Sequence, residues 1–310
     1  MSIAICIPAY NAAEYLPRLL RSAQGQAFPF NEILVYDDCS TDDTARLAER
    51  WGARVIQGDV NRGCSYGKNR LAEHSSSEWL HFHDADDDLL PAFTTLVGQW
   101  IKEKGDDYDI LLLNFDYVDA NTGKLLGQAG HNIAELHQDP LKYAITHKIV
   151  NFGVYKRDAF LKAGGFDLDD KVLYNEDNAF HQRLARLNYR FEYLPEVTCI
   201  NYRYGESMSA SNVLKCAQAN FHVLEKTAVT HGIKYPAELS EQLWNCVATL
   251  AACGDWIYVR KALDLSRALG YRHSPAGNPL FKMLTHINPF CAVKWREKLI
   301  RLFKPHLRNG

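Results

Sequence analysis

Short apolar runs alternate with stretches of helical periodicity along the first 118 residues. The apolar runs predict β-strands at residues 3–7, 32–36, 54–56, 78–83 and 109–115. Leu16, Leu19, Leu20 and Ala23 recur at helical spacing, and further helices are expected from the capping-box signal at residues 40–43 to about 51, over 66–74 and over 92–103. Strands that alternate with helices predict an α/β fold with a mostly parallel, doubly wound sheet flanked by helices.

The remaining chain changes character twice. Residues 119–209 are less regular, with expected elements at a hairpin turn (121–123), a strand (151–155), a helix ended by Gly164-Gly165 (157–163) and a helix opened by 174–178, with Phe180, Leu184 and Leu187 on one face. Helical patterns then cover 213–230, 237–253, 256–269 and 290–304. We therefore expect a domain at 1–209, with halves 1–118 and 119–209, and a helical C-terminal region at 210–310.

The composition favours a globular protein without membrane-spanning helices. Of the 310 residues, 47% are hydrophobic and 23% charged, and the formal net charge is -2, which is ordinary for a globular chain. No apolar run approaches the roughly 18 residues of a membrane helix. The apolar start lacks a basic segment and stops at Pro8, which favours a first strand over a signal peptide. The eight cysteines form no C-x-x-C pair, which favours reduced thiols in a cytoplasmic protein over disulfides or a zinc site.

Four carboxylates follow the expected strand at 78–83 within five positions. These residues are Asp84, Asp86, Asp87 and Asp88. Like charges at this density repel, and their burial without a counter-charge would be costly. Magnesium and manganese choose oxygen ligands and commonly take one or two carboxylates plus substrate phosphates. The cluster therefore indicates either a metal-nucleotide site or a solvated acidic turn whose Asp88 or a neighbour caps the next helix, and the cluster alone leaves both open.

Three polar loops follow three of the expected strands, at residues 8–11, 37–42 and 84–88. If the sheet is parallel, all three meet at one edge, where ligands of such sheets bind. The segment 61–70 supplies Arg62, Lys68 and Arg70 just before the acidic strand. We assign Lys68 to a phosphate or nucleotide contact; the alternative is a solvated lysine on a helix face.

Two further features have two interpretations each. Asp177, in the first turn of an expected helix, either complements the helix dipole, which its residue type favours, or acts as a general base. Residues 290–308 interleave apolar residues with six basic residues against one acid, Glu297. This is either a basic amphipathic helix on an anionic membrane surface or a packing helix with a solvated basic face. Nucleic-acid binding would rest on this terminus alone, and we do not expect it.

Several segments in order carry a resemblance to a known family. They are Ile5-Cys6-Ile7-Pro8-Ala9-Tyr10-Asn11, the segment 33–42 with Asp37-Asp38-Cys39-Ser40-Thr41-Asp42, the segment 61–69, Asp84-Ala85-Asp86-Asp87, Gly164-Gly165-Phe166-Asp167 and Asn175-Glu176-Asp177. Together they resemble the family 2 glycosyltransferases of GT-A fold over roughly residues 3–205.

The resemblance implies inverting transfer of a hexosyl or N-acetylhexosaminyl group from a nucleotide-sugar, usually a UDP-sugar, with Mg²⁺ or Mn²⁺. The acceptor would be a saccharide or lipid-linked hydroxyl in bacterial cell-surface polysaccharide or glycolipid synthesis. Independently of the resemblance, the cysteines favour a cytoplasmic protein, and if residues 290–308 lie on a membrane, this would be its cytoplasmic face.

The resemblance also implies a role for each matching residue. Pro8 and Tyr10, with Ala9 between them, would line the uracil and ribose pocket, and Asp38 would accept from the uracil N–H. Lys68 stands where the family commonly has arginine, and a lysine cannot form a bidentate fork. Asp86 would ligate the metal, Asp84 would contact ribose or donor sugar, and Asp177 would be the catalytic base.

The sequence departs from the family pattern at two places. Cys39 stands where the family often has glycine, and the loop at 202–209 lacks the family's histidine, with Glu206 nearby. A catalytically silent nucleotide-sugar-binding or scaffold protein on the same fold is the main alternative. A dinucleotide oxidoreductase or a nucleotidyltransferase is disfavoured, because no glycine-rich phosphate loop follows the first strand.

Overall fold

The computed structural model describes residues 2–150, 152–204 and 212–308. It contains two compact units, which are described separately. The first comprises residues 1–141, 149–168 and 183–205, and the second comprises 142–148, 169–182 and 206–310. The expected boundary at residue 209 and the loop at 205–209 lie outside the described residues.

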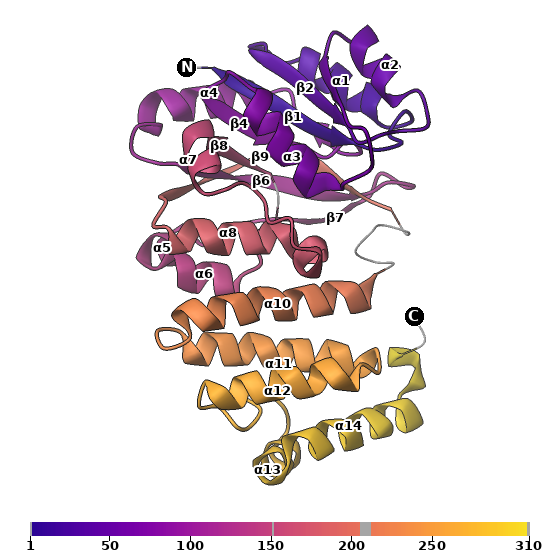
Figure 1. The fold of residues 1–310 in the computed structure, drawn as a ribbon, viewed down its shortest axis with the longest axis vertical. Helices are drawn as coiled ribbons and strands as arrows, with labels where there is room; N and C mark the ends of the chain where they lie inside the picture. The colour runs from indigo at the N-terminus through magenta and orange to yellow at the C-terminus, as the bar shows by residue number, and fades with distance from the viewer. Residues whose placement is uncertain (1, 151, 205–211, 309–310) are drawn as a thin grey trace. The chain divides into compact units, whose positions relative to one another are not determined.

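A mixed sheet of nine strands, as far as the structure describes the chain, forms the centre of the first unit (Figure 1). The strand order is β3-β2-β1-β4-β8-β6-β9-β5, with β7 paired to β6. The strands are β1 (Ile3–Ala9), β2 (Glu32–Asp37), β3 (Arg54–Gln57), β4 (Trp79–Phe82), β5 (Asp88–Leu89), β6 (Ile110–Asp119), β7 (Leu125–Gln128), β8 (Gly153–Lys156) and β9 (Phe191–Arg203).

The strand directions confirm an α/β fold and refine its sheet. The four strands β3, β2, β1 and β4 pair in parallel, as expected for the first half of the chain. β8 then runs antiparallel to both β4 and β6, whereas β6 and β9 are parallel. The expected turn at 121–123 joins the antiparallel hairpin β6–β7. The sheet is therefore parallel where the three polar loops leave it and mixed beyond.

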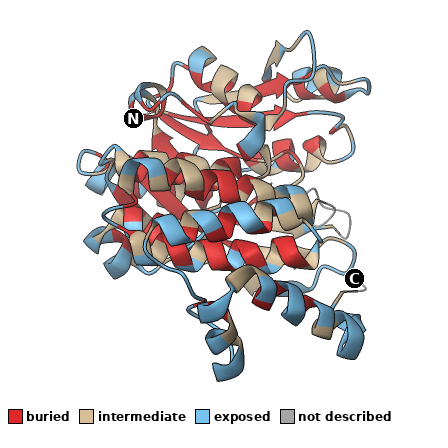
Figure 2. Ribbon diagram, turned by 60° about the horizontal axis from the view of Figure 1, so that its bottom comes forward, coloured by how far each residue is buried: buried red, intermediate tan, exposed pale blue. Residues whose placement is uncertain are grey.

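Six helices in the described part of the first unit pack beside this sheet. They are α1 (Leu16–Gln24), α2 (Thr44–Arg50), α3 (Cys64–His74), α4 (Phe93–Lys104), α5 (Ile133–Gln138) and α7 (Arg157–Lys162). The four residues of the predicted stripe in α1 are all at most 1% exposed. Trp79 of β4 packs edge-to-face on Trp100 of α4, with ring centroids 5.7 Å apart, and the strands are mostly buried (Figure 2).

Two local expectations were wrong. The capping box at 40–43 does not form, because the Ser40 hydroxyl accepts from the Asn11 N–H instead, and α2 begins at Thr44. Leu187 does not share the buried face of Phe180 and Leu184: it lies past the end of its helix and is exposed.

The second unit is helical in its described part. It contains most of α6 (Pro140–Thr146), the 3₁₀ helix η1 (Asp170–Asn175), the start of α8 (Glu176–Arg186), α10 (Val213–His231), α11 (Pro236–Ala252), α12 (Trp256–Ala268), α13 (Pro279–Ile287), α14 (Pro289–Phe303) and η2 (Pro305–Leu307). Our sequence analysis missed α13. Gly277-Asn278-Pro279 has the composition of a turn, but Asn278 caps the helix by accepting from the Phe281 N–H at 2.8 Å.

Two findings concern the expected absence of membrane helices and of disulfides. Among the described residues, no helix is long and apolar enough to cross a bilayer. No disulfide joins the eight cysteines.

Gly67 allows α3 to approach the ends of β1 and β2 closely. A Cβ at this position would lie 2.8 Å from Cδ1 of Tyr36 and 3.3 Å from Cβ of Pro8. We expect Gly67→Ala to lower the free energy of unfolding by about 1–3 kcal/mol, because the added methyl group overpacks a rigid contact. Urea unfolding measures the loss. Gly127→Ala is the control, since no atom lies within 4 Å of its added Cβ. Equal effects of the two substitutions would contradict this account.

Candidate active site

The three polar loops meet at one edge of the sheet, as the parallel strands require. The Asp38 N–H donates to the carbonyl of Ala9 at 2.9 Å, which joins the loops after β2 and β1. The Thr41 N–H donates to the side-chain oxygen of Asn11 at 2.8 Å, and the His83 N–H donates to the carbonyl of Cys6 at 3.0 Å. This edge is therefore cross-linked by hydrogen bonds between residues far apart in the sequence.

The position of Cys39 has the backbone conformation that glycine would favour. Its φ is +63°, in the left-handed region, where a side chain is strained. The chain therefore adopts the left-handed conformation at this position although the residue is not a glycine.

Asp38 shapes the loop that opens α3. The carboxyl group is buried, and its two oxygens accept from the backbone N–H groups of Arg62 and Gly63, at 2.8 and 2.7 Å. Gly63 has φ +85°, so it turns the chain into the helix. Each carboxylate oxygen has a second acceptor position. Asp38 can therefore fix this loop and still accept from a ligand.

The three residues expected at the nucleotide pocket differ in exposure. Pro8 and Ala9 are buried at the end of β1, in register with Tyr36 and Asp37 of β2. The ring of Tyr10, one residue beyond the strand, is 51% exposed. Of the three, Tyr10 is thus the side chain that can present an aromatic face to a ligand.

Lys68 is buried, so the solvated-lysine alternative is wrong. It lies on the inner face of α3 and is 1% exposed. Its ammonium group lies 3.5 Å from the carboxylate of Asp84 and 5.1 Å from the centre of the Phe166 ring. The helix that Asp38 anchors at its start therefore brings a positive charge to the acidic loop. The other two cations of the segment, Arg62 and Arg70, form ion pairs with Asp59 and Glu73, each three positions away in the sequence.

The four carboxylates of the acidic loop have different partners, and Asp87 is the most enclosed. It is 1% exposed and accepts from the side-chain amide of Asn201 at 2.7 Å and from the Tyr202 N–H at 2.8 Å. Burial and the charges of Asp84 and Asp86 raise the pKa of the Asp87 carboxyl well above its ordinary value. Asp87 therefore connects the loop to the end of β9.

Asp88 is paired with Arg18, a residue that sequence analysis did not find. The Arg18 guanidinium lies 3.1 Å from the Asp88 carboxylate, donates to the carbonyl of Asp86 and stacks on the Tyr202 ring at 4.0 Å. No local signal pointed to it, because Arg18 lies in the first turn of α1, 70 positions before Asp88 in the numbering. The solvated-turn interpretation with Asp88 as a helix cap is wrong, since α4 begins at Phe93.

Asn201 and Tyr202 bind the carboxylate of Asp87, and the Arg18 guanidinium binds that of Asp88. The carboxylates of Asp84 and Asp86 make neither of these contacts, and both residues are partly exposed. Burial and repulsion by Asp84 raise the pKa of the Asp86 carboxyl. A divalent cation between the two would relieve that repulsion, and both offer the oxygen atoms that Mg²⁺ and Mn²⁺ prefer. The donor set therefore fits such a cation.

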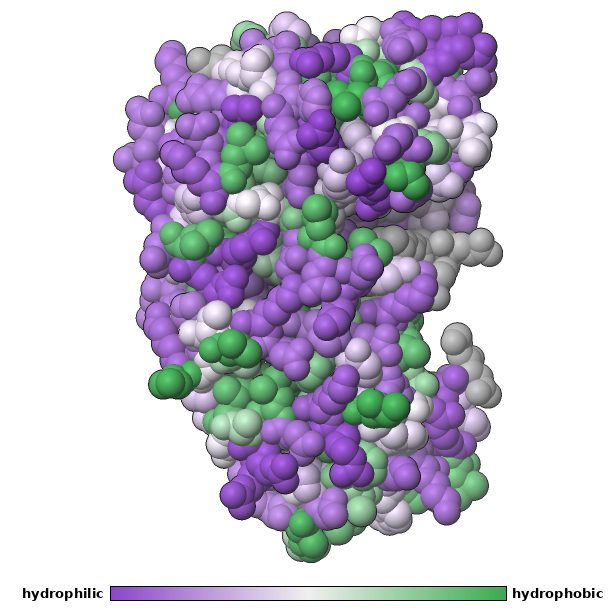
Figure 3. Space-filling model, in the orientation of Figure 1, coloured by the Kyte–Doolittle hydropathy of each residue, from purple (hydrophilic) through white to green (hydrophobic). Residues whose placement is uncertain are grey.

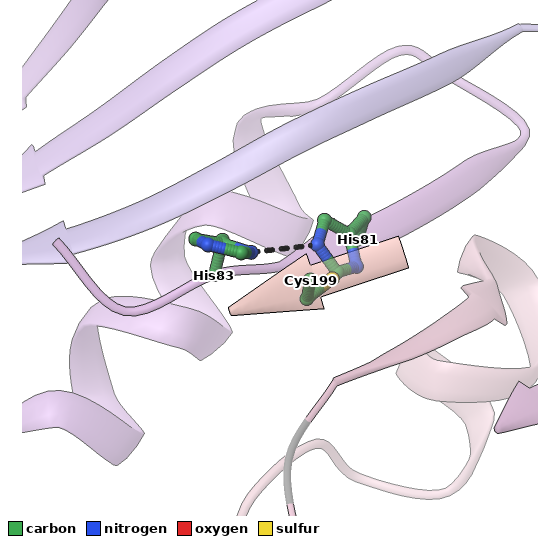
Figure 4. A group of neighbouring side chains, drawn as sticks. All are labelled: His81, His83 and Cys199. Atoms are coloured by element: carbon green, nitrogen blue, oxygen red, sulfur yellow. Dashed lines mark hydrogen bonds between the residues drawn. The ribbon is translucent and has the colours of Figure 1, made fainter. Parts of the chain in front are cut away.

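A second group of metal-type side chains lies directly behind this loop. Ligand atoms of His81, His83 and Cys199 lie within 4.8 Å of one another, and all three residues are buried (Figure 4). His81 contacts the carbonyl of Gly153 through Nδ1 at 3.0 Å, so Nδ1 carries the proton and Nε2 accepts from His83 Nδ1 at 2.9 Å. The two facing nitrogens thus share a proton, and burial lowers the pKa of His81 to about 4. We interpret the group as a neutral hydrogen-bonded pair in the core.

Asp177 belongs to the second unit and lies in the first turn of α8, as expected. Its side chain is partly exposed, and its carbonyl contacts Nδ1 of His181 at 2.7 Å. A helix N-terminus favours the ionised form of a carboxyl group at this place. The dipole interpretation and the catalytic one are therefore compatible.

Comparison with known proteins decides the family. A protein-family model described as "Glycosyl transferase family 2" matches residues 4–164, which is more than half of the chain. The chain belongs to glycosyl transferase family 2. The resemblance carried by the sequence motifs is thereby confirmed.

Curated family 2 relatives match parts of this chain. The poly(ribitol-phosphate) beta-N-acetylglucosaminyltransferase TarS of Staphylococcus aureus (strain Mu50 / ATCC 700699) is 35% identical over 223 residues, which cover 69% of this chain and 38% of TarS. The uncharacterized glycosyltransferase YibD of Escherichia coli (strain K12) is 26% identical over 175 residues, which cover 52% of this chain and 50% of YibD. The chain thus spans half or less of the length of these two relatives.

Solved structures confirm the GT-A glycosyltransferase fold. S. aureus TarS 1–349 in complex with UDP-GlcNAc has a TM-score of 0.63 at 18% identity, covering 97% of this chain and 92% of that one. The mannosyltransferase PcManGT from Pyrobaculum calidifontis, in complex with GDP-Man and Mn²⁺, has a TM-score of 0.56 at 19% identity, covering 98% and 81%.

Arg18→Ala tests whether Arg18 stabilises the acidic loop of this family 2 domain. The substitution leaves Asp88 without its cation, and we expect a loss of about 1 kcal/mol in the free energy of unfolding, since the pair is partly exposed. Arg21→Ala is the matched control, because Arg21 is an exposed arginine of the same helix that stacks on Trp51. If urea unfolding shows the same effect for both, Arg18 has no special role.

Proposed function

We propose that this chain transfers a sugar from a UDP-sugar to a hydroxyl group of a saccharide or lipid-linked acceptor, with inversion at the anomeric carbon. The geometric observation that supports it most directly is the pair Asp84 and Asp86, partly exposed at the edge to which Asp38 and Lys68 also belong. Family membership and the similarity to TarS, a beta-N-acetylglucosaminyltransferase, support a hexosyl or N-acetylhexosaminyl donor.

The donor nucleotide binds along the ends of β1 and β2 in this proposal. Tyr10 stacks on the base, and Pro8 and Ala9 form the apolar floor beside it. Asp38 accepts the uracil N–H through an oxygen position that Arg62 and Gly63 leave open. Lys68 contributes a positive charge on the diphosphate side, and Asp84 accepts from hydroxyl groups of the ribose or donor sugar.

Asp86 is the proposed protein ligand of Mg²⁺ or Mn²⁺, with Asp84 next to it. If bound there, such a cation would supply the positive charge that stabilises negative charge on the departing diphosphate oxygens. Arg18 and Asn201 have a structural role in this proposal. They hold the acidic loop in the conformation that presents the carboxylates of Asp84 and Asp86.

Asp177 is the proposed base for the acceptor. The acceptor oxygen attacks the anomeric carbon as the bond from that carbon to the diphosphate breaks. The bonding electron pair leaves with the diphosphate, and the hydroxyl proton passes to the Asp177 carboxylate. A single displacement from the opposite face inverts the configuration.

A silent nucleotide-sugar-binding protein on the same fold is the alternative. It would bind UDP with metal but transfer no sugar to any acceptor. A cytoplasmic location stays a prediction, as does membrane contact through 290–308.

Two substitutions separate the proposed roles. We expect Asp86→Ala to abolish transfer and to weaken metal-dependent UDP binding. Asp177→Asn should lower the rate of transfer by about 10²–10⁴-fold, since the proton acceptor is lost, while UDP binding is unchanged. Sugar transfer and isothermal titration with UDP and Mn²⁺ measure the two effects. Asp170→Asn is the control, because Asp170 is an exposed carboxylate seven positions before Asp177. Unchanged turnover in Asp177→Asn would remove the base assignment.

A thermal-shift screen of nucleotide-sugars with Mn²⁺ identifies the donor. A ligand that binds the folded chain at about 100 times its Kd stabilises it by about 2.7 kcal/mol. We expect one UDP-sugar to raise the melting temperature with Mn²⁺ and much less with EDTA. Stabilisation by GDP-sugars alone would contradict the UDP assignment.

A further inference from the structure

The last helices of the second unit expose two stripes of large apolar side chains. On α13, Leu280, Met283 and Ile287 lie on one face and are 52–77% exposed. On α14, Trp295 and Leu302 are seven positions apart, hence on one face, and are 49% and 66% exposed. These helices are mostly exposed or intermediate, and apolar atoms reach the surface near them among polar ones (Figures 2 and 3). Side chains of this size at such exposure are typical of an interaction surface.

The opposite side of α14 packs on its own unit. Ala292, Val293 and Glu297 face inward and are each 4% exposed. The Arg301 guanidinium donates to the carbonyl of Ala252 at the end of α11. The packing-helix interpretation is therefore correct for this inner face, and the outer stripe is additional to it.

Positive charge is concentrated around the stripes. Residues 279–308 contain seven Lys and Arg and one acid, a formal charge of +6 (7 − 1), so the rest of the chain carries -8 (-2 − 6). The one acid, Glu297, is buried and forms ion pairs with Arg301 and Arg308 at 2.9 and 2.8 Å. Glu297 is thus not available to neutralise the exposed lysines.

The arrangement of charges follows the outer stripe of α14. Lys294 and Lys298 are four positions apart and lie beside the Trp295–Leu302 stripe, and Arg296 lies on its other side. Basic side chains on both flanks of an apolar centre suit a helix that lies in the plane of a bilayer, because the stems reach along the apolar phase while the charges stay at the headgroups.

We propose that α13, α14 and η2 form a docking surface for an anionic lipid bilayer, with the apolar stripes inserted at the headgroup boundary. Charge complementarity selects this occupant. A second copy seated on the same face would oppose +6 to +6, which is repulsive. A nucleic-acid backbone is polar and charged, so it would leave the apolar side chains of Leu280, Met283 and Ile287 without an apolar partner. The proposal does not depend on sugar transfer.

Vesicle sedimentation of the full chain tests the proposal. We expect the protein to pellet with phosphatidylcholine vesicles that contain about 30% phosphatidylglycerol and not with phosphatidylcholine alone. Binding should weaken at about 0.5 M salt, where charges are screened within a few ångströms. Brominated lipids should quench part of the tryptophan fluorescence, and Trp295→Phe should remove that quenching.

Matched variants locate the surface. Replacing Lys294, Lys298 and Lys304 by Gln should lower partition onto anionic vesicles on the order of 100-fold, since each basic residue near such a surface contributes about a fivefold factor. The control replaces Lys102, Lys124 and Lys162 by Gln, which removes the same charge from exposed positions of the first unit. Leu302→Ser with Phe303→Ser should also reduce binding, whereas Val229→Ser with Ile233→Ser, at exposed positions before α11, should not.

Three results would overturn the proposal. One is absence of binding to anionic vesicles, and another is an equal loss in both lysine triplets. The third is a dimer by light scattering that Leu302→Ser with Phe303→Ser converts to a monomer, because the face would then be an interface between copies. Wild-type binding, its salt dependence and the quenching decide the question even if a variant fails to fold.

Discussion

Repulsion among the carboxylates after β4 is the constraint on which the rest of the site depends. Four aspartates within five positions cannot all stay charged and close without partners. The protein separates them by giving each a different environment. Asp87 is buried against the end of β9, Asp88 is neutralised by Arg18 from α1, and Asp84 faces the buried ammonium group of Lys68. Asp86 keeps the least compensated charge, and this supports the proposal that Asp86 is a ligand of the cation.

This arrangement couples the acidic loop to distant parts of the sheet. Asp38 anchors the start of α3, and α3 then presents Lys68 to Asp84. β9 supplies Asn201 and Tyr202 immediately before the segment 205–211. A change at any of these contacts therefore alters how the two remaining carboxylates are presented. The neutral pair His81–His83 behind the loop adds a polar but uncharged support, which does not increase the repulsion.

The last helices of the second unit concentrate positive charge. Residues 279–308 carry a formal charge of +6, while the remainder of the chain carries -8. Glu297 is buried and forms ion pairs with Arg301 and Arg308. It therefore does not neutralise the charges of the outer lysines. If the acceptor is lipid-linked, a bilayer-docked helix would bring the chain to the surface where such an acceptor resides. The membrane proposal and the transfer proposal are then two parts of one function, although each stands on separate observations.

The sequence by itself determined the order of strands and helices in the first half, because apolar periodicity and turn residues are local properties. It also determined that the loops carrying Tyr10, Asp38 and Asp84 share an edge, since parallel strands end on the same side. It did not determine which aspartates remain available to a ligand. That depends on Arg18, Asn201 and Tyr202, which lie 68 or more positions from their partners, and only the tertiary structure brings them together. The burial of Lys68 and the inner, packed face of α14 were likewise decided by tertiary packing, because the same local pattern fits a solvated and a packed face equally well.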